Sequence, residues 1–167
     1  NHPFAAVKIA WDRDLDVVYI VDEYRQSEQT PEEHSKVIIH WGKWLPWAWP
    51  HDGFAHDKGS GIPLKEQYER HGLNMMFEHA KFDDGSNGVE AGLMEMLDRM
   101  KSGKLKVFKN CDGWLSERRM YHREKGKVVK LKDDLISASR YGIMCLSRAK
   151  TQPSPKQHSR PLSWKVV

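Results

Sequence analysis

The sequence lacks the residue patterns that mark several classes of protein. It has only two cysteines in 167 residues, without CxxC spacing, which argues against a disulfide framework and a zinc ribbon. Its nine histidines show no HExxH or paired-ligand spacing, so a zinc site is not expected. No apolar run approaches the ~20 residues that span a bilayer, and no leader peptide pattern opens the chain. We therefore expect a soluble, intracellular protein without a membrane partner, in which Cys111 and Cys145 are buried thiols.

Charge is present in both signs with a small basic excess. The chain carries 27 basic and 23 acidic residues, a net charge of +4 and a pI near 9.0, which is compatible with a polyanionic partner. The basic residues gather in the third quarter, at Lys101, Lys104, Lys106 and Lys109 and then across 118–132. From charge alone, a solvated surface and a DNA-binding track explain this run equally well.

The alternation of apolar patterns predicts one α/β domain. Its length suits a single core, which we place at residues 1–150, followed by a mobile Pro/Ser/Lys/Gln-rich tail at 151–167. Thr30-Pro31-Glu32-Glu33 has the residues of a helix cap and capping box. The predicted strands are 3–12, 15–24, 47–49, 73–77, 105–108 and 128–131, and the predicted helices are 30–45, 64–71, 89–100, 114–121 and 133–148. We therefore expect a central mixed, partly parallel sheet flanked by helices.

Asp52 is the first candidate for a functional carboxylate. It follows Trp49-Pro50-His51 at the end of a predicted strand and precedes a glycine-rich loop. Ligands of α/β proteins bind at such strand ends, so an acid there is a good metal-ligand candidate. An Asx turn that closes the strand is the competing explanation.

The adjacent pair Asp133 and Asp134 is the second candidate. Both precede an apolar helix, where acids in the first turn are favoured by the helix dipole and can be ordinary caps. Two neighbouring carboxylates also suit Mg²⁺ or Mn²⁺, which prefer oxygen ligands. Neither candidate decides the function alone.

Three segments taken in order resemble the RNase H-like nuclease domain of phage terminase large subunits. Residues 1–7, Asn-His-Pro-Phe-Ala-Ala-Val, resemble the segment after the family's first acidic motif. Trp49-Pro50-His51-Asp52-Gly53 is similar to the second acidic motif, and Lys132-Asp133-Asp134-Leu135-Ile136 is similar to the Lys-Asp-Asp-Leu motif that opens the last helix. The family's first acid would precede Asn1, and the ATPase motor would also lie upstream. Gly59-Ser60-Gly61 lacks the lysine and the spacing of a phosphate-binding loop, so we expect no ATP hydrolysis by this chain.

The resemblance implies a metal-dependent endonuclease that cleaves double-stranded viral DNA during packaging with little sequence specificity. Asp52, Asp133 and Asp134 would hold two divalent cations, Mg²⁺ or Mn²⁺, ~4 Å apart, for in-line attack on a phosphodiester. Lys58, Lys127, Lys130 and Lys132 would contact DNA phosphates. The implied partners are duplex DNA, the upstream ATPase domain, the portal and the small terminase subunit, in the host cytoplasm at the procapsid.

Two other functions fit the same residues. A non-catalytic module that docks on DNA or a portal-like protein is favoured by the missing first acid. Another RNase H-like enzyme, such as a junction resolvase or a transposase core, would prefer branched DNA. Five tryptophans could stack on bases, but their helical and strand spacing favours a place in the core: Trp41, Trp44, Trp47, Trp49 and Trp114.

Overall fold

The main sheet of the protein is built on a long hairpin. The computed structural model describes residues 3–55, 61–124, 127–128 and 132–152. Strand β1 (Phe4–Asp12) pairs antiparallel with β2 (Val17–Gln26), and β2 pairs parallel with β5 (Leu105–Val107). The Asp12 side chain closes the hairpin turn by accepting hydrogen bonds from the backbone of Asp14 and Leu15, both at 3.1 Å. The expected mixed sheet is therefore confirmed, with the strand order β1-β2-β5.

Strand β2 contains a β-bulge that decides where its later side chains point. The register pairs Lys8 with Asp22 but Ile9 with Ile20, so Val21 is the extra residue. A strand alternates its side chains between two faces, and one extra residue reverses the alternation. Glu23 therefore lies on the same face as Val18 and Ile20, which are fully buried.

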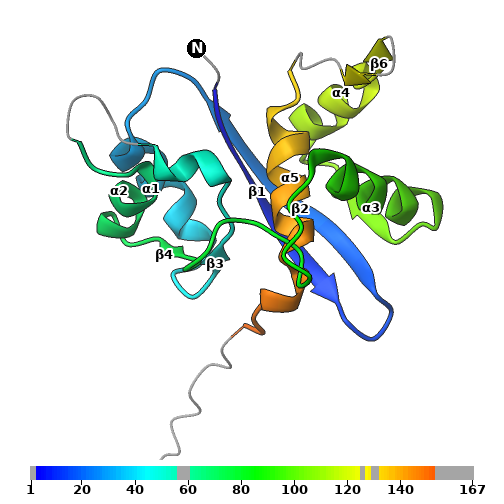
Figure 1. Cartoon of the computed structure of the whole chain (residues 1–167), viewed down its shortest axis with the longest axis horizontal. Coiled ribbons are helices and arrows are strands. Elements are labelled where there is room, and N and C mark those ends of the chain that lie inside the picture. Colours follow the sequence, from blue (N-terminus) through cyan, green and yellow to red (C-terminus); the bar gives the residue numbers. More distant parts are fainter. Residues whose placement is uncertain (1–2, 56–60, 125–126, 129–131, 153–167) are drawn as a thin grey trace, which may run out of the picture.

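Helices cover that face of the sheet. The α-helices are α3 (Val89–Lys101), α4 (Asp112–Met120) and α5 (Asp134–Met144), and the 3-10 turn η3 (Leu146–Arg148) follows α5. Figure 1 shows α5 lying across β1 and β2, with α3 and α4 beside it. The apolar side chains of these elements form the main core, with Val18, Ile20, Met96, Trp114, Leu135 and Ile143 among its buried members.

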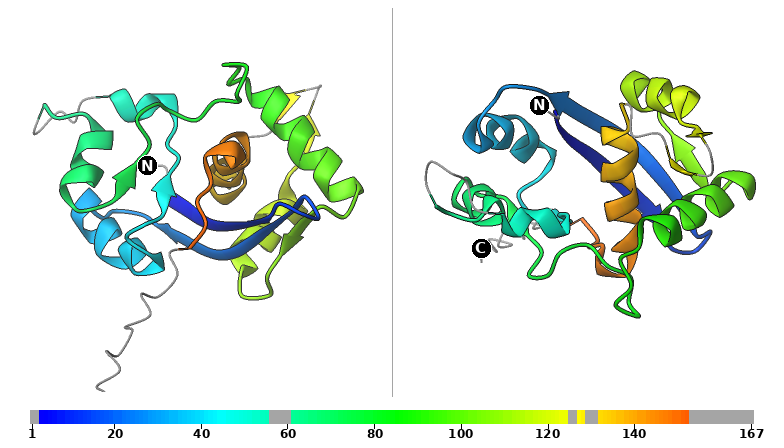
Figure 2. Two further views of the ribbon diagram at one scale, coloured as in Figure 1. Left: turned by 90° about the horizontal axis from the view of Figure 1, so that it is seen from below. Right: turned by 45° about the horizontal axis from the view of Figure 1, so that its top comes forward.

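A smaller set of elements packs beside β1 and has its own core. In chain order these are α1 (Pro31–Ile38), η1 (Ile39–Trp41), β3 (Pro46–Trp47), η2 (His51–Phe54), α2 (Leu64–Arg70) and β4 (Asn74–Met75), with β3 and β4 forming a separate parallel pair. Ala6, Ile38, Tyr68 and Leu73 form this second core. Both views in Figure 2 place these elements on the opposite side of β1 from α3 and α4. Another short pair, β6 (Arg123–Glu124) and β7 (Lys127–Val128), follows α4.

Several predicted boundaries are corrected by the structure. The helix that begins at Thr30 ends at Ile38 and continues only as the turn η1, because Gly42 adopts a φ of 141° that a helix cannot continue. Trp44 and Leu45 therefore lie beyond it. The predicted strand 73–77 is shortened to β4, and the last helix ends at Met144 before η3. Of the predicted strand 128–131, residues 129–131 fall outside the described residues.

Other expectations concern the cysteines, the membrane and the tail. Cys111 and Cys145 are both buried and unbonded to each other, and burial raises the pKa of the Cys111 thiol to about 11.

Within the described residues no helix is long and apolar enough to cross a membrane. The predicted domain limits at 1–150 and the predicted mobile tail stay predictions, since residues 153–167 fall outside the described part of the chain.

Candidate metal-binding cleft

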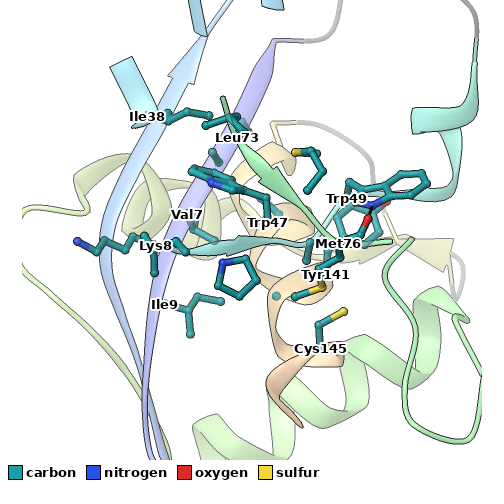
Figure 3. Close-up of a pocket in the computed structure, with 18 of the residues that line it drawn as sticks. Val7, Lys8, Ile9, Ile38, Trp47, Trp49, Leu73, Met76, Tyr141 and Cys145 are labelled. Carbon is teal, nitrogen blue, oxygen red and sulfur yellow. Dashed lines mark hydrogen bonds between the residues drawn. The ribbon is translucent and has the colours of Figure 1, made fainter. Parts of the chain in front are cut away.

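One large cavity runs along the free side of β1. It has a volume of about 1320 Å³ and is lined by Pro3, by residues 4–11 of β1 and by the segment 44–50 that contains β3. Because successive residues of β1 line it, the cavity follows the strand's edge. Figure 3 shows Val7 and Ile9 on one side, Trp47 and Trp49 on the other, and Tyr141 of α5 and Cys145, which follows α5, nearby. The same cavity is lined by all three predicted carboxylates, Asp52, Asp133 and Asp134.

Asp52 reaches the cavity from η2 and not from the tip of a strand, which corrects the expectation. Strand β3 ends at Trp47, although Trp49 still accepts a 2.7 Å hydrogen bond from the Ala80 backbone. Pro50 then begins the turn. Gly53 allows the turn to lie on the Trp49 ring, because a Cβ there would stand 2.6 Å from Trp49 Cε3. The indole of Trp49 is itself fixed by its hydrogen bond to the Met76 carbonyl at 2.7 Å, so Asp52 lies on a rigid support.

The Asx turn offered as the alternative explanation for Asp52 is not found. Within the described residues the Asp52 carboxylate accepts no hydrogen bond, and its turn is closed by backbone groups, with the Ala55 N–H donating to the Asp52 carbonyl at 2.8 Å. The side chain is exposed. Its carboxylate is therefore open to a ligand from solvent.

The second pair of acids lies at the N-terminus of α5. Asp133 is the N-cap residue and Asp134 the first helical residue, and both are half-buried. An N-cap side chain normally accepts from the second or third helical N–H. Asp133 makes no such bond, and within the described residues its nearest polar partner is the Ser137 hydroxyl at 3.5 Å. The capping explanation therefore does not apply to the Asp133 carboxylate, although both acids still gain from the helix dipole.

The cap of α5 is supplied by Glu117 of α4. Its Oε2 accepts from the backbone N–H groups of Leu135 at 2.8 Å and Ile136 at 3.1 Å, which are the second and third helical residues. Burial raises the pKa of the Glu117 carboxyl, against the lowering effects of these backbone donors and of Arg25, whose Nη1 lies 2.5 Å from Oε1. No pattern in the sequence marks Glu117 as a capping residue, because it stands among charged residues that are typical of a solvated helix face.

The three carboxylates do not close a metal site by themselves. In the part of the chain that the structure describes, no three His, Cys, Asp or Glu side chains lie close enough together to hold a metal ion. The chemistry of the donors fits Mg²⁺ or Mn²⁺, since all three side chains are carboxylates and the three residues line one cavity. Asp52 and the acid pair at the start of α5 therefore line the cavity from two separate elements.

The predicted DNA-contacting lysines are only partly described. Lys58 and Lys130 fall outside the described residues, and only the backbone of Lys127 is described, in β7. Lys132 is exposed beside Asp133, with a φ of 52°, and does not line the cavity. Lysines that line it were missed by the sequence analysis: Lys8, Lys65 and Lys150. Nothing in the sequence separates them from other surface lysines.

The tryptophans divide between the core and the cavity. Trp49 and Trp114 are 3% exposed, as expected for core residues. Trp41 and Trp47 are half-buried and stack with their ring centroids 5.7 Å apart, and both line the cavity, as Trp44 does. The prediction of core positions is therefore right for the first two and incomplete for the others.

The fold and its relatives identify the class of the domain. A solved structure described as the P22 large terminase nuclease domain superposes with a TM-score of 0.83 at 43% identity, over 90% of this chain and 78% of that one. The model of the family described as "Terminase RNaseH-like domain" matches residues 1–146. The predicted RNase H-like α/β fold is thereby confirmed, and the chain belongs to the terminase RNase H-like domain family.

Two curated relatives are similar over the same region. The large terminase subunits of Enterobacteria phage LP7 and Salmonella phage P22 are each 45% identical over 145 residues, 86% of this chain. The match spans 30% of the LP7 protein and 29% of the P22 protein. This chain therefore corresponds to less than a third of the length of these two relatives.

Proposed function

We propose that this domain is a divalent-metal-dependent endonuclease that cuts double-stranded viral DNA during genome packaging, with little sequence specificity. The supporting observation is that Asp52 and the pair Asp133 and Asp134, far apart in the sequence, line one cavity in a member of the terminase nuclease family. None of the three carboxylates caps a helix or closes a turn through described residues, so they remain available as ligands.

Asp52, Asp133 and Asp134 are the proposed ligands of two divalent cations, Mg²⁺ or Mn²⁺. When bound, such cations activate water and stabilise the leaving oxygen of a phosphodiester. The protein's part is to hold the carboxylates on rigid supports, Asp52 over Trp49 and the acid pair on the capped end of α5. Lys58, Lys127, Lys130 and Lys132 are the proposed phosphate contacts, which position DNA without reading its sequence.

A further acid completes this site in our proposal, supplied by residues that precede Asn1 in the whole protein. Two observations support this. No three described ligand side chains form a cluster, and the cavity follows a β1 edge that pairs with no other strand among the described residues. The matched relatives are more than three times as long as the match, so they contain chain that could supply it.

The same proposal assigns the partners and the location of the protein. We propose an ATPase domain in the same polypeptide, and the portal and small terminase subunit as binding partners, acting at the procapsid in the host cytoplasm. The relatives' name, terminase large subunit, supports this assignment.

Plasmid cleavage tests the nuclease proposal. The chain and a version extended upstream are incubated with supercoiled plasmid and Mn²⁺, Mg²⁺ or EDTA, beside Asp52→Asn and the control Asp98→Asn, an exposed acid on α3. We expect metal-dependent cleavage by the extended protein, lost by at least about 100-fold in Asp52→Asn and kept in Asp98→Asn. Cleavage retained in Asp52→Asn would contradict the role of Asp52.

A non-catalytic docking module is the second candidate, and the absence of a three-ligand cluster among the described residues favours it. It predicts that both lengths retard DNA without nicking it under any metal. Preference for branched over linear duplex DNA would instead indicate another RNase H-like nuclease, such as a junction resolvase.

A further inference from the structure

The N-terminus of α5 is capped by a side chain from another helix. The second and third N–H groups of α5 both donate to Glu117 Oε2, at 2.8 and 3.1 Å. These are the groups that the side chain of Asp133, the N-cap residue, would otherwise bind. If Asp133 capped its own helix, its carboxylate would turn toward the backbone and away from the cavity. Because Glu117 of α4 caps α5, the Asp133 carboxylate is not needed as a cap, although its position in the sequence would suggest that role.

Glu117 is held in place from its other side. Its side chain is 1% exposed, and a buried carboxylate is costly unless its charge is compensated. Arg25 of β2 provides the compensation with Nη1 at 2.5 Å from Oε1, while Oε2 faces the positive end of the α5 dipole. The two carboxylate oxygens thus have separate partners, one ionic and one at the helix end.

The N-terminus of α4, the helix that contains Glu117, is also capped by a glutamate from another element. Glu23 of β2 accepts from the Gly113 N–H at 2.7 Å and from the Trp114 N–H at 2.8 Å, in the first turn of α4. Strand β2 therefore holds α4 through Glu23, and holds Glu117 through Arg25. The bulge at Val21 places Glu23 on the helix-covered face of the sheet. A continuous chain of contacts runs from the sheet to the acid pair.

We propose that Glu117, oriented by Arg25, is a positioning residue for the metal-binding carboxylates Asp133 and Asp134. It fixes the first turn of α5 and leaves both acids free to face the cavity. This inference rests on the proposed metal-dependent nuclease function. Residues that orient metal ligands typically affect metal affinity about 10- to 100-fold when they are replaced.

Substitutions at Glu117 separate its two interactions. Glu117→Ala removes the cap and the ion pair together. Glu117→Gln retains a carbonyl oxygen that can accept from both N–H groups, but it loses the charge that pairs with Arg25. Arg25→Gln leaves the cap and removes only the ionic partner, and the Arg25 side chain is 35% exposed, so its loss creates no closed cavity.

Asp16→Asn is the matched control. The Asp16 carboxylate, just before β2, accepts from Arg99 and Trp11, each at 3.1 Å, and from Lys104 at 3.2 Å. Asparagine tolerates the φ of 51° at this position. The substitution therefore weakens an ionic cluster of the fold that includes no residue of α4 or α5 and none of Asp52, Asp133 and Asp134.

The test measures Mn²⁺ affinity and DNA cleavage in the full-length protein. Mn²⁺ binding is followed by electron paramagnetic resonance without DNA, and cleavage is measured across a Mn²⁺ titration. We expect Glu117→Ala to weaken Mn²⁺ binding and raise the half-maximal Mn²⁺ concentration by about 10-fold or more, with smaller shifts in Glu117→Gln and Arg25→Gln. Asp16→Asn should leave both quantities unchanged, and DNA binding in EDTA should be equal in all variants.

The outcomes distinguish this inference from the nuclease proposal. Wild-type protein that neither binds Mn²⁺ nor cleaves DNA would overturn the nuclease proposal and this inference with it. Wild-type activity with unchanged Mn²⁺ dependence in folded Glu117→Ala would overturn the positioning role alone. If Glu117→Ala does not fold by circular dichroism, Glu117→Gln and Arg25→Gln decide: Mn²⁺ dependence equal to that of Asp16→Asn in both overturns the inference.

Discussion

The N-termini of α1 and α5 both border the cavity, and they satisfy their backbone N–H groups in different ways. At α1, Thr30 and Glu33 form a reciprocal capping box, with the Glu33 N–H donating to Thr30 Oγ1 and the Thr30 N–H donating to Glu33 Oε2 at 2.7 Å. At α5, the cap comes from Glu117, which is distant in sequence. Glu33 therefore stabilises the start of α1, whereas within the described residues Asp133 makes no capping hydrogen bond at the start of α5. The position of an acid at the start of a helix therefore does not reveal its role until its hydrogen bonds are known.

The largest effect expected from this comparison concerns folding stability. Glu117→Ala leaves two buried N–H groups without an acceptor and Arg25 without its partner, so we expect a loss of about 3 kcal/mol in the free energy of unfolding. Thr30→Ala should cost about 1 kcal/mol, because an exposed end can use water instead. Urea unfolding of the two variants measures the difference. Equal losses in the free energy of unfolding for the two variants would contradict the proposed difference between the two caps.

A second prediction concerns the acids of α5 themselves. Because neither Asp133 nor Asp134 caps the helix through its side chain, Asp133→Asn and Asp134→Asn should change the free energy of unfolding by no more than about 0.5 kcal/mol. Both should still lose metal-dependent cleavage, as carboxylate ligands would. Thermal unfolding of both variants beside Thr30→Ala checks this. A loss as large as that of Thr30→Ala would show that the acids serve α5 as structural caps.

The smallest expected effect is a difference in pH dependence between the two caps. Hydrogen bonds from the Thr30 backbone and hydroxyl lower the pKa of Glu33, so its stabilising contribution is present above the ordinary value of 4.5 and is lost as pH falls through the lowered pKa. Burial raises the pKa of Glu117, so its contribution is largest below 4.5 and declines as pH rises through the raised pKa.

Urea unfolding of the wild type, Glu33→Gln and Glu117→Gln between pH 3 and pH 7 tests these opposite signs. The stability gap between wild type and Glu33→Gln should widen as pH rises, and the gap between wild type and Glu117→Gln should narrow. Parallel trends for the two gaps would contradict the assigned causes of the pKa shifts.

The segment Trp49–Gly53, which contains Asp52, was predicted in part from the sequence. In the structure, Asp52 and the acid pair at the start of α5 are among the residues that line one cavity, and their role as a shared site stays a prediction. The prediction that Asp52 lies at the tip of a strand was wrong. Pro50 turns the chain into η2, which contains Asp52, and Gly53 allows that turn to pack on Trp49. This packing depends on the Met76 carbonyl that fixes the Trp49 ring, a contact between residues 27 positions apart.

Local sequence determined the parts of this protein whose interactions are short in range. The α1 cap, the hairpin turn at Asp12 and the alternation of strands and helices follow from residues within a few positions of one another, where chain entropy hardly opposes the contact. Together with the motif order they were enough to predict an RNase H-like α/β domain, and the family match confirms it.

The capping of α5 by Glu117, in place of Asp133, depends on tertiary contacts. The bulge at Val21 places Glu23 on the helix-covered face, from which it caps α4, and Arg25 reaches Glu117 across 92 sequence positions. A one-residue bulge reverses the alternation of a strand without any mark in composition or periodicity. The ion pair and the cap on α5 exist only once β2, α4 and α5 have packed together, because each contact joins residues that no local pattern connects.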